Sequence, residues 1–177
     1  IQPKIKKLPS TPRMLLDDMH IFEPFPSEEK DQLSTKMRSR EFRPEQNVVK
    51  QGDSGDSLFI IAEGTLSVRI SRNGSEDDLE VARLGAGDFF GEMALLTGEP
   101  RMATVASLTN THVYEITKAD IYPSIKRQEG SLEAISEELS KRKMALMPQN
   151  PSEDLEAKQK NIAEQILGGI VNFFGFK

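Results

Sequence analysis

The sequence predicts a mainly β fold with flanking helices, in which short antiparallel strands form a small jelly roll. Eight of the twelve glycines fall between Gly52 and Gly98, as expected where a chain turns often between short strands. Inside that span Leu66, Val68 and Ile70 alternate with polar residues, which is the period of a half-buried strand. Both ends of the chain instead carry apolar residues at helical spacing. The fold class follows from this change of period.

Residues 1–37 are predicted to hold two short helices. Thr11 followed by Pro12 marks the start of the first, because Thr is a good N-cap and Pro fits the first helical position. The second helix runs from Ser27 to about Met37. This helical segment leads into the β-rich part of the chain.

Residues 38–117 are predicted to form the strands. Ser57–Glu63 is a continuous apolar run and is expected to lie deep, whereas Leu66–Ile70 should have one wet face. Asn73-Gly74 turns the second strand back, and Leu79 begins the next. Further short strands are expected at Asn47–Gln51, Ala103–Ser107 and His112–Thr117.

Residues 118–147 return to helical spacing. Thr117 is a suitable N-cap for a helix that carries Ile121 and Ile125 on one face, with Pro123 tolerated in its first turn. Gly130 ends this helix. A second helix follows, and its inward residues are expected to be Leu132, Ile135, Leu139 and Met144.

Residues 148–177 are predicted to form a final helix capped by Ser152-Glu153-Asp154. Its apolar stripe consists of Ile162, Ile166, Ile170 and Phe173 or Phe174. We expect this stripe to dock onto the same domain or onto a sister subunit of a homo-oligomer. A helix on a membrane surface is the alternative, but the polar face is not strongly basic.

The segment between residues 87 and 103 carries the main functional signal. Gly91 is expected to open a short helical turn whose first N–H groups, from Glu92 to Leu95, are unpaired and attract an anion. Arg101 supplies a guanidinium suited to a phosphate. Glu92 can only accept hydrogen bonds and would bind ribose hydroxyls. Together these groups indicate a site for a sugar phosphate.

Phe90-Gly91-Glu92-Met93-Ala94-Leu95 and, after a short spacer, Arg101-Met102-Ala103 resemble the phosphate-binding cassette of cyclic nucleotide-binding domains. The resemblance implies an eight-stranded antiparallel jelly-roll barrel with an inserted cassette, N-terminal helices and C-terminal lid helices. It also implies a 3′,5′-cyclic purine nucleotide as the ligand. The expected ligand-binding residues are Phe90, Gly91, Glu92, Met93, Ala94, Arg101, Met102 and Ala103, with Arg142 and Lys143 near the base on the lid helix. For Arg142 and Lys143 the alternative is a solvated helix face.

Met102 departs from the family pattern, which usually has a small or hydroxylated residue at this position. Without a hydroxyl to meet the guanine amino group, the site is expected to favour cAMP over cGMP. The alternative is that Met102 points into the barrel and has no influence. The predicted division is 1–37 for the N-terminal helical segment, 38–147 for the nucleotide-binding barrel with its lid helices, and 148–177 for the C-terminal amphipathic helix.

The residue inventory favours a binding module over an enzyme. His20 and His112 are the only histidines and are isolated in the sequence, so no metal set is expected. No nucleophile elbow or paired catalytic carboxylates stand out. We therefore expect no enzymatic activity, no metal and no cofactor besides the cyclic nucleotide ligand.

Length, charge and cysteine content limit the partners. A chain of 177 residues can bury one sizeable core and carry appended helices. The net charge of −5 argues against nucleic acid, and the absence of cysteine excludes disulfides. The longest apolar runs, Leu58–Ala62 and Ile166–Phe174, fall short of the ~20 residues of a membrane span. The start at Ile1, without a signal sequence, indicates a fragment, so the effector is expected N-terminal to it.

Three effectors are compatible with the resemblance. The closing segment 166–176 resembles the tail of bacterial mechanosensitive-type channels with a C-terminal nucleotide sensor, which implies a cytoplasmic domain of an inner-membrane protein. A transcription regulator of the same fold should carry a helix-turn-helix after the lid, and only one helix follows. A kinase regulatory subunit usually carries two such domains and a basic inhibitory segment. The channel is therefore the expected effector, with the other two as alternatives.

Overall fold

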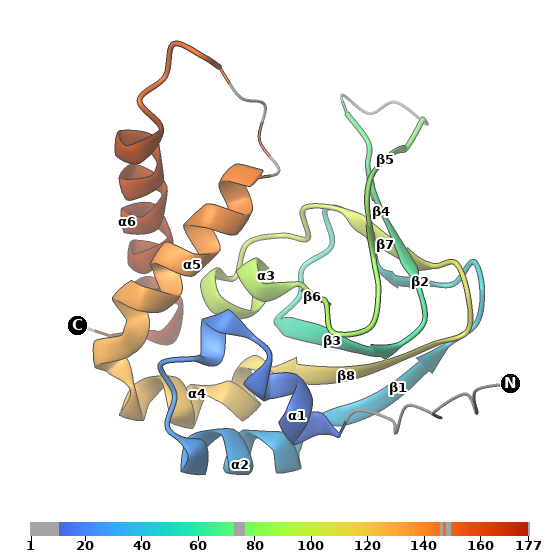
Figure 1. Ribbon diagram of the computed structural model, residues 1–177, viewed down its shortest axis with the longest axis horizontal. Helices are drawn as coiled ribbons and strands as arrows, with labels where there is room; N and C mark the ends of the chain where they lie inside the picture. Colours follow the sequence, from blue (N-terminus) through green and yellow to red (C-terminus); the bar gives the residue numbers. More distant parts are fainter. Residues whose placement is uncertain (1–10, 73–76, 146, 148–149, 177) are drawn as a thin grey trace, which may run out of the picture.

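The computed structural model describes residues 11–72, 77–145, 147 and 150–176 of the chain. Figure 1 shows strands on the right of the view and the three C-terminal helices on the left. The elements in chain order are α1 (Pro12–Asp17), η1 (His20–Phe22), α2 (Ser27–Lys36), β1 (Arg38–Phe42), β2 (Asn47–Val49), β3 (Ser57–Glu63), β4 (Leu66–Ile70), β5 (Leu79–Leu84), β6 (Phe89–Phe90), α3 (Glu92–Thr97), β7 (Thr104–Ser107), β8 (Thr111–Thr117), α4 (Lys118–Arg127), η2 (Glu129–Ser131), α5 (Leu132–Ala145) and α6 (Leu155–Phe174).

Two four-stranded antiparallel sheets form the β part, with strand orders β1-β8-β3-β6 and β2-β7-β4-β5. The fold is therefore the mainly β jelly roll with added helices that the sequence predicts. The cassette lies between β6 and β7, so its helix α3 is held by one strand from each sheet. The predicted turn at Asn73-Gly74 lies outside the described residues.

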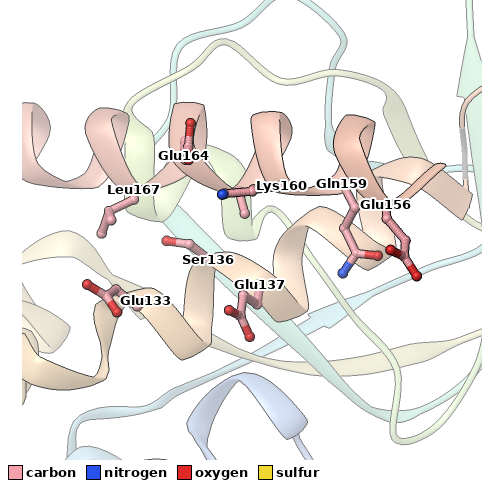
Figure 2. A pocket seen from close by; sticks show the side chains of 9 residues that line it. Glu133, Ser136, Glu137, Glu156, Gln159, Lys160, Glu164 and Leu167 are labelled. Atoms are coloured by element: carbon pink, nitrogen blue, oxygen red, sulfur yellow. The ribbon is translucent and has the colours of Figure 1, made fainter. Parts of the chain in front are cut away.

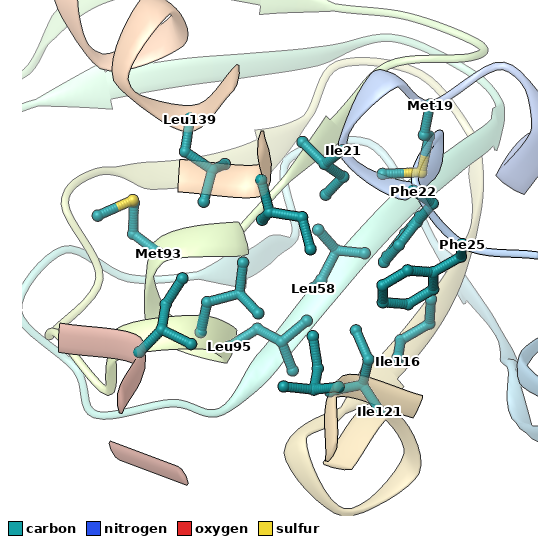
Figure 3. Close-up of a cluster of buried hydrophobic side chains, with 14 of the residues drawn as sticks. Met19, Ile21, Phe22, Phe25, Leu58, Met93, Leu95, Ile116, Ile121 and Leu139 are labelled. Carbon is teal, nitrogen blue, oxygen red and sulfur yellow. The ribbon is translucent and has the colours of Figure 1, made fainter. Parts of the chain in front are cut away.

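β3 is buried on both faces, as its continuous apolar sequence predicts. Its Phe59 and Ile61 side chains enter a small cluster between the sheets. Leu58 and Ile60 enter a larger cluster beneath the helices, because successive side chains of a strand point to opposite faces. Figure 3 shows this larger cluster, in which side chains from the N-terminal helices, α3 and α5 meet β3 and β8.

The prediction of a wet face on β4 is wrong at Ser67, which is completely buried. The Ser67 hydroxyl donates to a carboxylate oxygen of Glu80 at 2.9 Å and accepts from Nε of Arg69 at 3.2 Å. Two long charged side chains therefore cover this serine, and its polar atom keeps hydrogen-bond partners. The alternation of apolar and polar residues in β4 does not reveal that charged side chains cover Ser67.

The N-terminal helices begin where the sequence predicts. The Thr11 side chain accepts the N–H of Met14 and caps α1. In α2, Glu29 accepts from Nη2 of Arg127 in α4 at 2.9 Å. This hydrogen bond lowers the pKa of the buried Glu29 carboxyl from its usual value. The ion pair ties the segment before the barrel to the helix that follows it.

α4 begins with a capping box in which Thr117 and Asp120 each accept the other's backbone N–H. Pro123 lies beyond the first turn, inside the helix, so the predicted position of this proline is wrong. The helix continues past it because Ile121 and Ile125 are completely buried in the larger cluster, and their burial offsets the lost backbone bond.

α5 and α6 pack along each other. The predicted inward residues Leu132, Ile135 and Leu139 are all buried. The Asp154 side chain caps α6 by accepting the N–H groups of Glu156 and Ala157. The α6 stripe is also buried in the larger cluster, through Ile162, Ile166, Ile170 and Phe174. The final helix therefore docks onto this chain's own domain. Across the part of the chain that the structure describes, no helix combines the length and apolarity of a membrane span.

Candidate anion-binding site

Gly91 starts the cassette helix in the left-handed conformation, with φ of 86°. This φ favours glycine, and a Cβ at this position would also lie 2.7 Å from the Ser57 carbonyl oxygen. The Leu95 N–H donates to the Gly91 carbonyl at 3.1 Å. The predicted run of unpaired donors therefore ends one residue earlier, at Ala94, because the first intrahelical bond already uses Leu95.

Arg101 is fixed by its backbone to the loop before β3. Its N–H donates to the Asp53 carbonyl at 2.9 Å, and its carbonyl accepts the Gly52 N–H at 2.8 Å. The side chain then crosses to the start of α3, where Nη1 donates to the carbonyls of Ser57 at 2.7 Å and Gly91 at 3.5 Å. The structure thus brings Arg101 and the donor turn together, as the sequence predicts.

Glycines surround the guanidinium closely. A Cβ on Gly55 would lie 2.5 Å from both Nε and Nη2 of Arg101, and one on Gly91 would lie 2.6 Å from Nη1. Side chains at these two positions would collide with the guanidinium. The guanidinium therefore fits between Gly55 and Gly91 only because neither residue has a side chain.

The electrostatic environment keeps a charge on the buried Arg101, which is 8% exposed. Burial lowers the pKa of its guanidinium, while the nearby carboxylates of Asp56, Glu115 and Glu92 raise it. The guanidinium carbon also lies 5.7 Å from the centroid of the Phe59 ring. A buried cation with few direct partners is suited to receive an anion.

Glu92, the predicted acceptor for ribose, contacts α5, the helix predicted to be the lid. Nε of Arg142 lies 3.2 Å from its Oε1 atom. Arg142 also donates to the Phe89 carbonyl, and its guanidinium carbon lies 3.9 Å from the Phe89 ring centroid. The structure therefore brings Arg142 of α5 onto the start of the cassette helix. For Lys143, the described part of the chain records no ion pair or side-chain hydrogen bond.

The other predicted site residues fall into two groups. Phe90, Met93 and Ala94 are buried, and the Phe90 ring stacks on Phe59 with 5.1 Å between centroids. These side chains pack in the core and help to hold the turn in place. Met102 is 47% exposed, which rules out the alternative that it is buried in the barrel. Ala103 is partly exposed beside it.

Sequence reasoning missed the loop that supports Arg101 from the opposite side. Gly55 and the carboxylate of Asp56 come from this loop, and the carbonyl of Ser57 comes from the first residue of β3. The Ser57 hydroxyl donates in turn to Glu115 at 3.1 Å. The available signal was the pair of glycines with two acidic residues in Gly52-Asp53-Ser54-Gly55-Asp56, directly before a buried strand.

A separate groove of about 550 Å³ lies between α5 and α6 (Figure 2). Four of the residues that line it are glutamates, and Lys160 points between the two helices. None of the predicted site residues lines this groove. Among the described residues no cluster of three or more His, Cys, Asp or Glu is arranged to hold a metal ion.

Comparisons with known proteins agree on one family. A family model described as the cyclic nucleotide-binding domain matches residues 39–128, about half of the chain. The cAMP-dependent protein kinase regulatory subunit of Mycosarcoma maydis is 40% identical over 92 residues, which cover 52% of this chain and 17% of that protein. The type II regulatory subunit of Drosophila melanogaster is 35% identical over 91 residues, covering 51% and 24%.

The regulatory domain of Toxoplasma gondii PKA, solved with cAMP, has a similar structure. Its TM-score is 0.63 at 29% identity, over 75% of this chain and 48% of that one. The segments matched in the two curated relatives are 17% and 24% of their lengths, so the chain corresponds to only a part of each.

Proposed function

The chain belongs to the cyclic nucleotide-binding domain family, and from this membership we propose that it binds a 3′,5′-cyclic purine nucleotide at the N-terminus of α3. The buried guanidinium of Arg101 carries this proposal. It lies within 3.5 Å of the carbonyl that opens the donor turn, so one phosphate can contact the guanidinium and the α3 amides together.

The ribose lies beside the phosphate in this proposal. Glu92 accepts its 2′-hydroxyl, while Arg142 holds one carboxylate oxygen of Glu92 and brings the lid helix over the base. Phe90, Met93 and Ala94 serve through their backbone and their packing. Ala103 and Met102 line the mouth, and the partly exposed Lys143 follows Arg142 on the lid helix near the base.

We infer that cAMP is preferred over cGMP. Met102 is half-exposed next to Arg101 and offers no hydroxyl to the guanine amino group. Loss of water from that amino group without a replacement partner costs about 1–3 kcal/mol. The cAMP-dependent relatives and the PKA domain solved with cAMP support the same ligand.

The proposed output is regulation of an effector, without catalysis by this chain. The relatives named above are kinase regulatory subunits, which favours a protein kinase catalytic subunit as the partner and supports the kinase alternative over the channel. The presence of one such domain in this chain does not count against a kinase regulatory subunit, because the chain matches only a part of its relatives. The channel interpretation depended on segment 166–176, which packs here against α3 and α5.

The predicted segments 1–37, 38–147 and 148–177 are proposed to work as one unit. Residues of all three share the larger hydrophobic cluster, so a change at the nucleotide site can reach both ends of the chain. Assembly into a homo-oligomer and attachment to a membrane protein stay predictions.

Calorimetric titration with cAMP tests the function. Arg101→Ala should weaken binding by about 2–5 kcal/mol, the range for truncating one partner of a buried charge pair. Arg83→Ala is the matched control, since that arginine is exposed on β5 and pairs only with Glu80 in the described ion pairs. Equal cAMP affinity of wild type and Arg101→Ala, with the melting temperature unchanged, would contradict the assignment of Arg101. A wild-type chain that binds no cyclic nucleotide would overturn the function itself.

A further inference from the structure

α6 packs closely against the cassette helix α3, with one glycine on each partner at the contact. Gly98 ends α3, and a Cβ there would lie 2.5 Å from the Phe173 ring of α6. Gly169 of α6 faces Thr97 of α3, and its Cβ would lie 3.2 Å from the Thr97 methyl carbon. Each glycine makes room for a side chain of the other element. The spacing between α6 and α3 is thus set by reciprocal contacts.

α6 also packs against α5, the proposed lid helix. The buried stripe of α6 shares one hydrophobic cluster with Leu95 and Leu96 of α3 and with Leu132, Ile135 and Leu139 of α5. A packed cluster of this kind has no free volume to absorb a shift of one member. A displacement of α6 therefore changes the positions of α3 and α5 together.

A second route leads from the end of α6 to Arg101. Lys118 Nζ donates to the Phe173 carbonyl at 2.9 Å and lies 3.6 Å from the centroid of its ring. A cation is favourable there because the C-terminal end of a helix is negative. The Lys118 backbone N–H donates to the Asp56 carbonyl at 2.8 Å, and Asp56 lies between Gly55 and Ser57, the residues that contact the guanidinium.

We propose that α6 is a positioning element for the anion site, and that its docking and nucleotide binding strengthen each other. Phe173 contacts both the end of the donor helix and the lysine that supports the Arg101 loop. Docked α6 therefore fixes the distance between the α3 amides and the guanidinium, which a single phosphate must bridge. By linkage, a nucleotide that needs this spacing must stabilise the docked state by the same factor. The inference rests on the proposed function.

Two adjacent glycines of α6 provide a matched pair of variants. Gly169→Leu forces a side chain against Thr97 and should push α6 away from α3. At Gly168 a Cβ would meet nothing within 4 Å, so Gly168→Leu makes the same chemical change on the open side of the helix. Both substitutions replace a helical glycine and raise helix propensity equally.

The first measurement is cAMP affinity by calorimetry. Gly169→Leu should weaken binding by about fivefold or more, while Gly168→Leu should stay within about twofold of wild type. Equal affinities of the two variants would overturn the inference and leave the proposed function intact. Failure of the wild-type chain to bind any cyclic nucleotide would instead overturn the proposed function.

The second measurement is amide hydrogen exchange, and it does not depend on affinity. Without nucleotide, exchange across α3 should be faster in Gly169→Leu than in Gly168→Leu. In the wild type, cAMP should slow exchange within α6. Unchanged α3 exchange in Gly169→Leu would contradict a positioning role even if that variant were less stable overall. Phe173→Leu, which keeps an apolar side chain and loses the ring over Lys118, repeats the test without a glycine replacement.

Discussion

The two ends of α3 have opposite environments within a helix of six residues. At its N-terminal end Gly91 and Glu92 meet charged groups, namely the guanidinium of Arg101 and that of Arg142. At its C-terminal end Leu95 and Leu96 are buried, and the helix is enclosed by α6.

The two ends of α3 therefore have different proposed roles: the N-terminal end recognises the ligand, and the C-terminal end holds the helix on the domain. The N-terminal end offers backbone donors and one carboxylate, the groups proposed to bind the nucleotide. At the other end, Leu95 and Leu96 make apolar contacts with neighbouring elements, and these contacts keep the short helix in place. A helix of this length is not stable alone in water, so its binding geometry depends on the buried end.

The largest expected effect lies at the buried end. Leu95→Ala should lower the free energy of unfolding by about 2–5 kcal/mol, because it leaves a cavity in a fully packed cluster. Denaturant titration measures this loss. Leu79→Ala is the control, since Leu79 is 59% exposed on β5 and should change stability by about 0.5 kcal/mol or less. Similar losses at the two positions would mean that α3 is not held by its core contacts.

The opposite end should respond in the opposite way. Glu92→Gln keeps the shape of the side chain and should leave the unfolding midpoint nearly unchanged, while cAMP affinity falls by about 1.5–3 kcal/mol, the range for a hydrogen bond to a charged group. Calorimetry and thermal melting separate the two effects. Glu99→Gln, at an exposed position just after α3, should alter neither quantity. A large loss of stability in Glu92→Gln would show that Glu92 also holds the fold together, which would contradict a role in ligand binding alone.

A smaller effect concerns the choice of purine. Met102→Thr supplies a hydroxyl beside Arg101 and should shift the cAMP/cGMP affinity ratio toward cGMP by up to about tenfold, or ~1.4 kcal/mol. Competition of both nucleotides against a fluorescent analogue gives the ratio. Met102→Leu has no hydroxyl and should keep the wild-type ratio. If Met102→Thr keeps it too, the residue does not select the base.

The smallest effect should come from the lid. Arg142→Ala removes a partly exposed ion pair with Glu92 and a partly exposed cation–π contact with Phe89, which together should contribute about 1 kcal/mol or less to binding, so cAMP affinity should fall by up to about fivefold. Lys143→Ala is the neighbouring control, because Lys143 makes no recorded ion pair in the described residues. Equal cAMP affinities for the two variants would show that Arg142 is not the residue through which α5 contributes to binding.

Much of the fold was predictable because it depends on local signals. The caps at Thr11, Thr117 and Asp154 lie where the sequence places helix starts. β1 was not predicted as a strand, since Arg38–Phe42 is polar and mostly exposed. It exists because β8 pairs with it along its whole length. Such a strand is defined by its partner and leaves no pattern in its own residues.

The candidate site was predictable to the same extent. Gly91, Glu92 and Arg101 lie in one continuous segment with fixed spacing, so the sequence identifies them. Gly55 and Ser57 reach Arg101 only because the start of β3 lies beside the cassette. The glycines before β3 are a local signal, but they do not reveal which distant residue they meet. The ion pair between Glu92 and Arg142 likewise depends on how the lid packs. Contacts between distant segments set the details of the site.

The burial of β3 on both faces has a consequence for how the protein unfolds. One strand supplies side chains to both hydrophobic clusters, so neither cluster can melt while the other stays intact. Its main partner β8 is distant in sequence, which makes closure of the β3–β8 pair a slow, non-local step in folding. We expect a single cooperative transition in which the barrel and the helices are lost together, without a stable half-folded state.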